Sequence, residues 1–241
     1  MDSVLRILRA GLIASVAVGL IGWGLERARF GASDETALAR VQIEIRDRLD
    51  ATADALETIA GRVTVSADAL GAAPRDPAAS RALFDLTSLA LRDQETGRTG
   101  VTIYSADGTP LAWAGRVFDL PKEGLSGRPA WLLASGAIGP RLLLIQPLGE
   151  RLPAARGAAL SPAVVVEQSL HAVEGAGGVQ DGFVLPTSLV PVRLHPSPAG
   201  TPSPPTPFAF HVSSHGGAIA ADADVLPEDL AEARARWRSG T

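Results

Sequence analysis

The stretch that decides the fold is DETALARVQIEIRDRLDATADALETIAGRV, residues 34–63. Its apolar residues recur about every 3.6 positions, the period of one face of an α-helix. This stripe consists of Leu38, Val41, Ile45, Leu49, Leu56, Ile59 and Val63, with Thr52 in its one gap. Ser33, followed by Asp34 and Glu35, is typical of a helix start. We expect one long amphipathic helix that packs on a domain core, pairs as a stalk with a second copy through the same stripe, or does both.

An apolar segment precedes this helix. Residues 10–25 carry no charge, and the apolar residues Val4, Leu5, Ile7 and Leu8 extend the segment toward the amino terminus. A helix of this length crosses a hydrocarbon core of about 30 Å. We therefore expect an uncleaved membrane anchor over residues 1–32.

Two alternatives to the anchor stay open. A cleaved secretory signal would use Arg6 and Arg9 as its positive region, but the bulky Phe30 stands where a cleavage site needs a small residue. A buried core helix would carry its apolar residues along one stripe, whereas here they surround the helix. The arginine count is nearly even on the two sides of the segment, so charge does not set the orientation.

Composition excludes some classes of function. The chain has 241 residues, which leaves room for one or two domains after the anchor. A net charge of −4 gives no basic surface for nucleic acid. Because cysteine is absent, disulfides and thiolate metal sites are excluded.

The sequence pattern stays helical up to residue 93 and becomes strand-like beyond it. A second helix is expected over residues 76–93, capped by Asp76 or Ser80. Residues 101–105 and 109–115 alternate around Asp107-Gly108, which predicts a hairpin. Residues 117–138 are rich in Gly and Pro and predict loops and short helices. Two apolar runs, residues 141–148 and 163–170, predict strands, the second buried on both faces if it is central.

The last third of the chain is harder to interpret. Residues 183–194 are a weak strand candidate interrupted by prolines, and eight prolines between Pro186 and Pro207 predict an extended loop over residues 181–207. Residues 208–212 and 218–221 predict two strands around His215-Gly216-Gly217, and residues 226–237 predict a helix. We expect residues 208–241 to close the first domain or to begin a second module.

The order of these elements resembles the extracytoplasmic PAS-like sensor domains called Cache or PDC domains, which occur in bacterial histidine kinases and chemoreceptors. The likeness rests on VTIYSADGTPLAWAG (residues 101–115), similar to the strand-turn-strand of that family, and on GPRLLLIQPLG (139–149) and SPAVVVEQSL (161–170), similar to its later central strands. The resemblance implies an α+β fold with a transmembrane helix, a stalk helix and an antiparallel sheet flanked by helices. It implies a sensor domain over residues 33–180.

A search for catalytic patterns finds no nucleophile elbow, phosphate-binding glycine loop or zinc-protease helix. His211 and His215, four residues apart, would share one face of a strand and with Asp222 or Asp224 form a metal site. The simpler interpretation is a polar hairpin surface, and we predict no metal, cofactor or enzyme activity in this region.

Ligand contacts are expected on the sheet and beneath the segment that covers it. Aromatic residues supply contact area, and arginine binds carboxylate or phosphate with two parallel hydrogen bonds. By position the ligand-binding candidates are Tyr104, Trp113, Arg116, Trp131 and Arg141. Each also has a structural interpretation, as a core, sheet or solvent-exposed residue.

The resemblance implies the input region of a membrane signal-transduction receptor, of the histidine-kinase type, lacking its output domain. Residues 33–241 would face the periplasm from a single-pass anchor in a bacterial inner membrane. Expected partners are a small-molecule ligand, the membrane and a second copy through the stalk helix, with no nucleic acid. The alternatives are a non-signalling envelope scaffold or assembly protein and, less favoured, a secreted hydrolase.

Overall fold

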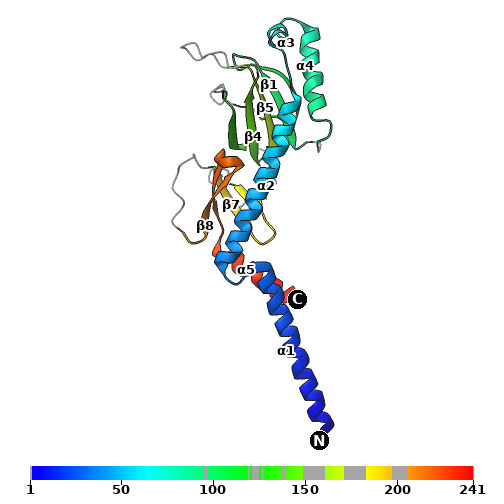
Figure 1. Cartoon of the computed structure of the whole chain (residues 1–241), viewed down its shortest axis with the longest axis vertical. Coiled ribbons are helices and arrows are strands. Elements are labelled where there is room, and N and C mark those ends of the chain that lie inside the picture. The colour runs from blue at the N-terminus through cyan, green and yellow to red at the C-terminus, as the bar shows by residue number, and fades with distance from the viewer. Residues whose placement is uncertain are drawn as a thin grey trace.

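A computed structural model describes residues 2–94, 97–118, 120, 125, 128–136, 139–148, 161–170, 183–196 and 206–240. Two antiparallel sheets lie along one long helix, and a second long helix projects away from them (Figure 1). The fold is therefore mixed helix and antiparallel sheet, as the sequence predicts.

The projecting helix is α1, Asp2–Phe30. Within it, Gly11–Phe30 is long and apolar enough to cross a membrane. Its apolar side chains are not covered by the rest of the chain, since Leu12, Val18 and Ile21 are 67, 69 and 62% exposed. Helix α1 ends at Phe30, and the next residue, Gly31, has a φ of +83° and approaches Thr36 so closely that a Cβ atom would not fit.

Helix α2, Asp34–Arg62, follows after three residues, with Ser33 as its N-cap. Its predicted stripe is confirmed as a core face, because Val41, Ile45, Leu49, Leu56 and Ile59 are all buried. These side chains lie inside the chain's own core and are not available to a second copy. Association through α2 must therefore use a different face, such as that of Ile43, which is 54% exposed.

The first sheet has five strands in the order β2-β1-β5-β4-β3. Their bounds are β1 Thr99–Tyr104, β2 Pro110–Gly115, β3 Ala130–Gly136, β4 Gly139–Pro147 and β5 Ala163–Ser169. The predicted hairpin β1–β2 and the two predicted apolar strands are confirmed, and β5 is central with both faces covered. Helix α4, Pro77–Ala90, capped by Asp76, packs beside β2 and β1 of this sheet, and α3, Ala67–Ala72, contacts α4.

Strand β3 corrects one prediction. It lies within residues 117–138, where loops and short helices were expected, and it pairs with β4 from Ala130↔Ile145 to Gly136↔Gly139. The flanking glycines and Pro129 concealed a short run of strand-forming residues, Trp131-Leu132-Leu133. Pairing with a buried neighbour, rather than local propensity, makes this segment a strand.

The second sheet has four strands in the order β6-β7-β9-β8. They are β6 Phe183–Pro186, β7 Pro191–Pro196, β8 Ala209–Ser214 and β9 Ile219–Asp224. The expected loop over residues 181–207 is therefore wrong for residues 183–196, which form a hairpin with Pro186 opposite Pro191 at its turn. Residues 197–205 lie outside the described part.

The strands β8 and β9 predicted near residues 208–221 are confirmed; β8 pairs with β9, and β9 pairs with β7 rather than with the first sheet. A one-turn helix, η2 (His215–Gly217), joins them, and α5, Pro227–Gly240, follows. Residues 208–240 thus complete a second sheet that begins at Phe183. The end of α5 lies beside α1 (Figure 1).

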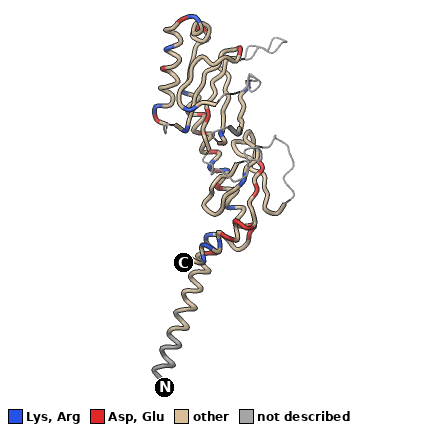
Figure 2. The backbone as a smooth tube through the Cα atoms, turned by 180° about the vertical axis from the view of Figure 1, so that it is seen from behind, with Lys and Arg blue, Asp and Glu red and all other residues tan. Residues whose placement is uncertain are grey.

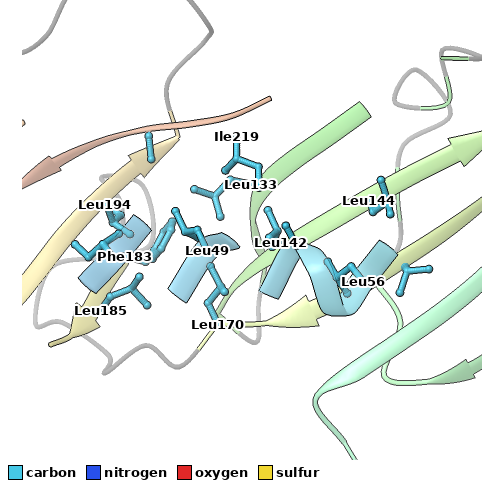
Figure 3. Packing of buried hydrophobic residues seen from close by; sticks show 14 of the residues in the cluster. Leu49, Leu56, Leu133, Leu142, Leu144, Leu170, Phe183, Leu185, Leu194 and Ile219 are labelled. Atoms are coloured by element: carbon cyan, nitrogen blue, oxygen red, sulfur yellow. The ribbon is translucent and has the colours of Figure 1, made fainter. Parts of the chain in front are cut away.

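Both sheets share one apolar core through α2. Figure 3 shows Leu49 between Phe183 of the second sheet and Leu142 of the first. Toward the end of α2, Leu56 faces Leu144, while Ile219 and Leu133 meet where the two sheets adjoin. The cluster extends from Phe30 at the end of α1 to Ala233 in α5.

The position of Leu49 generates a prediction about stability. Leu49→Ala removes buried apolar atoms from the core of both sheets, so we expect a loss of about 2–5 kcal/mol in the free energy of unfolding. Chemical denaturation of the purified chain in detergent, followed by circular dichroism, measures it. The matched control Ile43→Ala changes an exposed position of the same helix and should stay within about 0.5 kcal/mol. Equal losses would contradict the shared core.

Candidate functional site

A buried ion pair lies on the face of the first sheet that points away from α2, here called the outer face. Arg141 of β4 and Glu167 of β5 are each 1% exposed, and Arg141 Nη1 donates to Glu167 Oε2. On the same face a separate apolar cluster contains Leu143, Val165 and Tyr104. The outer face therefore has its own small core with two charges at one end.

The ion pair holds the segment that follows β2. Arg141 Nη1 donates to the carbonyl of Arg116 over 2.9 Å, and the backbone N–H of Phe118 donates to Glu167 Oε1 over 2.5 Å. Glycines let the backbone cross here: a Cβ on Gly100 would lie 2.4 Å from the Arg116 carbonyl oxygen, and Gly115 has a φ of +74°. Residues 116–118 thus cover the outer face through bonds to both charges.

Burial sets the electrostatics of the pair. It raises the pKa of the Glu167 carboxyl, and this outweighs the opposing effects of the Phe118 N–H and the Arg141 guanidinium. A carboxyl whose folded pKa is raised costs stability at a pH above that pKa, and the cost disappears as the pH falls. The Arg141 guanidinium and the Phe118 N–H therefore offset only part of the desolvation penalty of the ionised carboxylate.

The five predicted ligand residues do not form one site. Tyr104 and Arg141 lie on the outer face, and Arg116 joins them through its backbone carbonyl while its side chain is exposed. Trp113 is 48% exposed on β2, and its ring meets Phe84 of α4 edge-on at 5.0 Å. Trp113 therefore packs the sheet against α4, away from the buried Arg141–Glu167 ion pair.

Trp131 lies on the opposite face, at a junction that the sequence did not predict. It packs against the apolar core, and its ring meets that of His215 edge-on at 5.0 Å. His215 Nε2 lies 2.9 Å from Glu57 Oε1 of α2. Apart from glycines, His215 alone among the described residues has a positive φ, 51°. Two sheets and one helix therefore meet at a single strained residue.

Asp50 of α2 completes this junction. Ser214 Oγ and the backbone N–H of His215 each donate to Asp50 Oδ1 over 2.7 Å. The Ser214 hydroxyl, with the His215 N–H, lowers the pKa of Asp50. A carboxyl with a lowered folded pKa stabilises the fold above its ordinary pKa, and this stabilisation is lost as the pH falls through the lowered value. The junction is thus a charged anchor at neutral pH.

The histidines and acids predicted as a possible metal site separate in space. His211 Nδ1 pairs with Asp222 Oδ1 and His195 Nε2 with Asp224 Oδ1, both at 2.9 Å, whereas His215 belongs to the junction with Glu57. His215 lies in η2, so the strand spacing that would have placed it beside His211 does not apply. In the described part of the chain, no three His, Asp or Glu side chains form a group that could hold a metal ion.

An open groove of about 670 Å³ lies between the start of α2 and the start of β8. None of the five predicted ligand residues lines it. Its lining residues are Asp34, Glu35, Leu38, Ala39, Gln42, Pro207, Phe208, Ala209 and Phe210.

The most informative site residue that the sequence analysis missed is Glu167. It lies in the run AVVVEQS, which was treated as an apolar strand. A lone carboxylate in a strand buried on both faces needs a partner, and this was the available signal. Ser214 and Phe118 carried no such signal, because their roles depend on neighbours brought close by the fold.

Comparison with protein-family models found no family that matches this chain, and comparison with curated proteins found no match. Function is therefore inferred from the geometry of the fold.

The buried pair generates a prediction about coupling. Arg141→Met or Glu167→Leu alone leaves one buried charge without its counter-ion, so each should cost about 3–5 kcal/mol in the free energy of unfolding. The double variant buries no charge and should lose at least about 2 kcal/mol less than the sum of the two. Denaturant titration of all four proteins measures this.

The exposed pair Arg62–Asp93, with a separation of 3.3 Å, is the control. Arg62→Met should cost less than about 1 kcal/mol because solvent screens that pair. Additive losses for Arg141 and Glu167 would contradict the coupling.

Proposed function

We propose that this chain is the extracytoplasmic ligand-sensing input region of a membrane signal-transduction receptor of the histidine-kinase type. In this proposal α1 anchors the chain in a bacterial inner membrane, and residues 33–241 face the periplasm. The observation that carries it is the unbroken core that joins two sheets, through α2, to the end of an exposed apolar helix. A rearrangement of either sheet has a physical route to α1.

The topology of the first sheet supports the resemblance to PAS-like sensors. The two runs expected as later central strands, β4 and β5, are interior strands, and β5 lies between β1 and β4. One face packs on α2, and the other is covered by the segment after β2. One face of this sheet is fixed against α2, and the other lies under the segment that follows β2. This arrangement suits reversible ligand binding on the covered face.

The junction of α1, α2 and α5 supports a mechanical output. Arg238 of α5 binds Glu26 of α1 through two hydrogen bonds of 2.6 and 2.9 Å, and Arg234 pairs with Asp34 at the start of α2. The Arg29 guanidinium lies 4.9 Å from the centre of the Trp237 ring. Figure 2 shows charges of both signs gathered where α5 lies beside α1. A shift of α5 relative to α2 would break and re-form these contacts, as a two-state switch requires.

The same proposal includes association of two copies along α2. The buried stripe is occupied, so the exposed face around Ile43 is the surface that remains on this helix. Parallel α2 helices in a pair of anchored chains would bring the two Ile43 side chains together and carry a change in one sensor to both anchors.

Accessibility to a membrane-impermeant thiol reagent tests the proposed orientation, since the native chain has no cysteine. We expect Ala106→Cys, at the exposed turn between β1 and β2, to be labelled in intact cells. Ser3→Cys, beyond the apolar segment, should be labelled only after the cells are opened. Detection of labelled chain on gels measures both.

The reverse pattern would overturn the extracytoplasmic assignment. Labelling of both variants in intact cells would overturn the anchor, because the two positions would then lie on the same side of the membrane. An envelope scaffold gives the expected pattern too, and saturable binding of a small-molecule ligand separates a receptor from it.

Association is tested with a matched pair of isoleucines. Under mild oxidation in membranes, Ile43→Cys should form a disulfide between copies, whereas Ile45→Cys, whose side chain is buried two positions away, should not. Non-reducing gels measure the fraction of dimer. Failure of Ile43→Cys to cross-link above the level of Ile45→Cys would contradict a dimer through this face.

A further inference from the structure

Two buried side-chain atoms on the outer face have no hydrogen-bond partner in the described structure: Arg141 Nη2 and Ser169 Oγ. They belong to residues that face each other across the β4–β5 ladder, with Arg141↔Ser169 in register. Side chains of directly paired residues point to the same face and lie about 5 Å apart at their Cβ atoms. The two unpaired atoms therefore belong to neighbouring residues of the outer face.

The neighbouring polar groups are already occupied. Arg141 Nη1 donates to both Glu167 and the Arg116 carbonyl, and both Glu167 oxygens accept hydrogen bonds. What remains is donor capacity: two N–H groups on Arg141 Nη2 and the hydroxyl of Ser169. Buried donors without acceptors are costly, so two of them on neighbouring residues of one face point to an acceptor that binds there.

Charge decides which kind of acceptor fits. Glu167 already neutralises the Arg141 guanidinium in a place that is closed to solvent. A carboxylate or phosphate would add a second negative charge beside Glu167, and like charges in a desolvated site are strongly unfavourable. A neutral carbonyl, amide or hydroxyl accepts the same hydrogen bonds without that cost. The structure thus argues against the anionic ligand that a lone arginine suggested.

Residues 116–118 form the cover over this place. The Arg116 N–H donates to the Thr99 carbonyl over 3.1 Å, the Arg116 carbonyl and the Phe118 N–H bond to the ion pair, and the Phe118 side chain packs against the outer apolar cluster. The core between α2 and the sheet lies on the other face and is not involved. Movement of the cover gives a route to the two donors at a smaller cost than opening the main core.

We propose that Arg141 Nη2 and Ser169 Oγ form a binding subsite for a small neutral ligand that presents a carbonyl, amide or hydroxyl oxygen. This inference rests on the proposed sensing function and names the ligand class of its outer face. Glu167 positions the guanidinium and excludes anions, while Ser169 supplies the second donor.

The experiment compares matched neutral and anionic probes on the full chain in detergent. Acetamide and propionamide are titrated against acetate and propionate at constant ionic strength, and the melting temperature is followed. We expect a saturable rise in Tm of about 2 °C or more with the amides once each exceeds its Kd several-fold. The carboxylates should give no saturable rise.

Two variants separate a ligand role from a structural one. Ser169→Ala removes an unpaired buried hydroxyl, so without probe its Tm should equal or exceed that of the native chain, yet the amide-induced rise should be lost. Arg141→Lys keeps a positive charge beside Glu167 but lacks the second nitrogen, and it should also lose the rise. Ser88→Ala, the same change at an exposed position of α4, should keep it.

Each other outcome overturns the subsite. A rise with carboxylates and not with amides would show that the ligand class is wrong. No saturable rise with any probe would mean that solvent alone satisfies the two donors. A rise that persists in Ser169→Ala would place binding elsewhere. None of these results bears on the orientation of α1, and reversed thiol labelling would overturn the proposed function while leaving probe binding intact.

Discussion

The apolar face of α2 is the interaction on which both sheets depend. The helix has 29 residues, which at about 1.5 Å each gives a length of about 44 Å. That is long enough for the second sheet to pack against one part and the first sheet against another. Each sheet needs a partner for its apolar face, and one helix supplies both. The two sheets therefore cannot change their packing independently of the helix that joins α1.

Polar contacts along α2 restrict the register of this packing. Strand β8 is an edge strand, and the side chains of Gln42 and Arg46 donate to the carbonyls of His211 and Ser213. On the other side of the helix, Glu44 accepts from the backbone and hydroxyl of Ser188. Sliding the helix by one turn would break these bonds on both sides. The second sheet is thus tied to α2 by geometry as well as by apolar burial.

The outer face of the first sheet is held together in a different way. Its buried ion pair adds little net stability, because desolvation offsets attraction, but it holds a covering segment at a defined place. Unpaired donors beside the pair depart from the rule that buried polar groups are satisfied. Local departures of this kind, in a chain whose main core is well packed, are expected where a protein binds something. The same face thus combines a paired sheet with a covering segment that is bonded to both buried charges.

Periodicity alone was enough to predict α2, its buried stripe and its Ser33 cap, because a helix is specified by neighbours three and four residues apart. The hairpin around Asp107-Gly108 and the apolar strands β4 and β5 were predictable for the same local reason. Strand β3 and the hairpin of β6 and β7 were not, since flanking glycines and prolines conceal strands that exist through pairing with distant partners. Local pattern also left open whether the stripe served a core or a dimer, and burial in the folded chain decided it.

The candidate site residues also separate into those that the sequence indicated and those that only the fold brought together. Arg141 and Tyr104 were predicted as ligand contacts from their position in the sequence, and that role stays a prediction. Only the fold brought Glu167 and Ser169 beside Arg141 and placed Trp113 and Trp131 elsewhere. The sequence gives the type of each side chain directly, but whether its charge has a counter-ion depends on residues that are far away in the sequence. The sequence by itself therefore determined a helix-and-sheet chain with an apolar leading helix, and only the tertiary structure decided that its buried arginine is already neutralised.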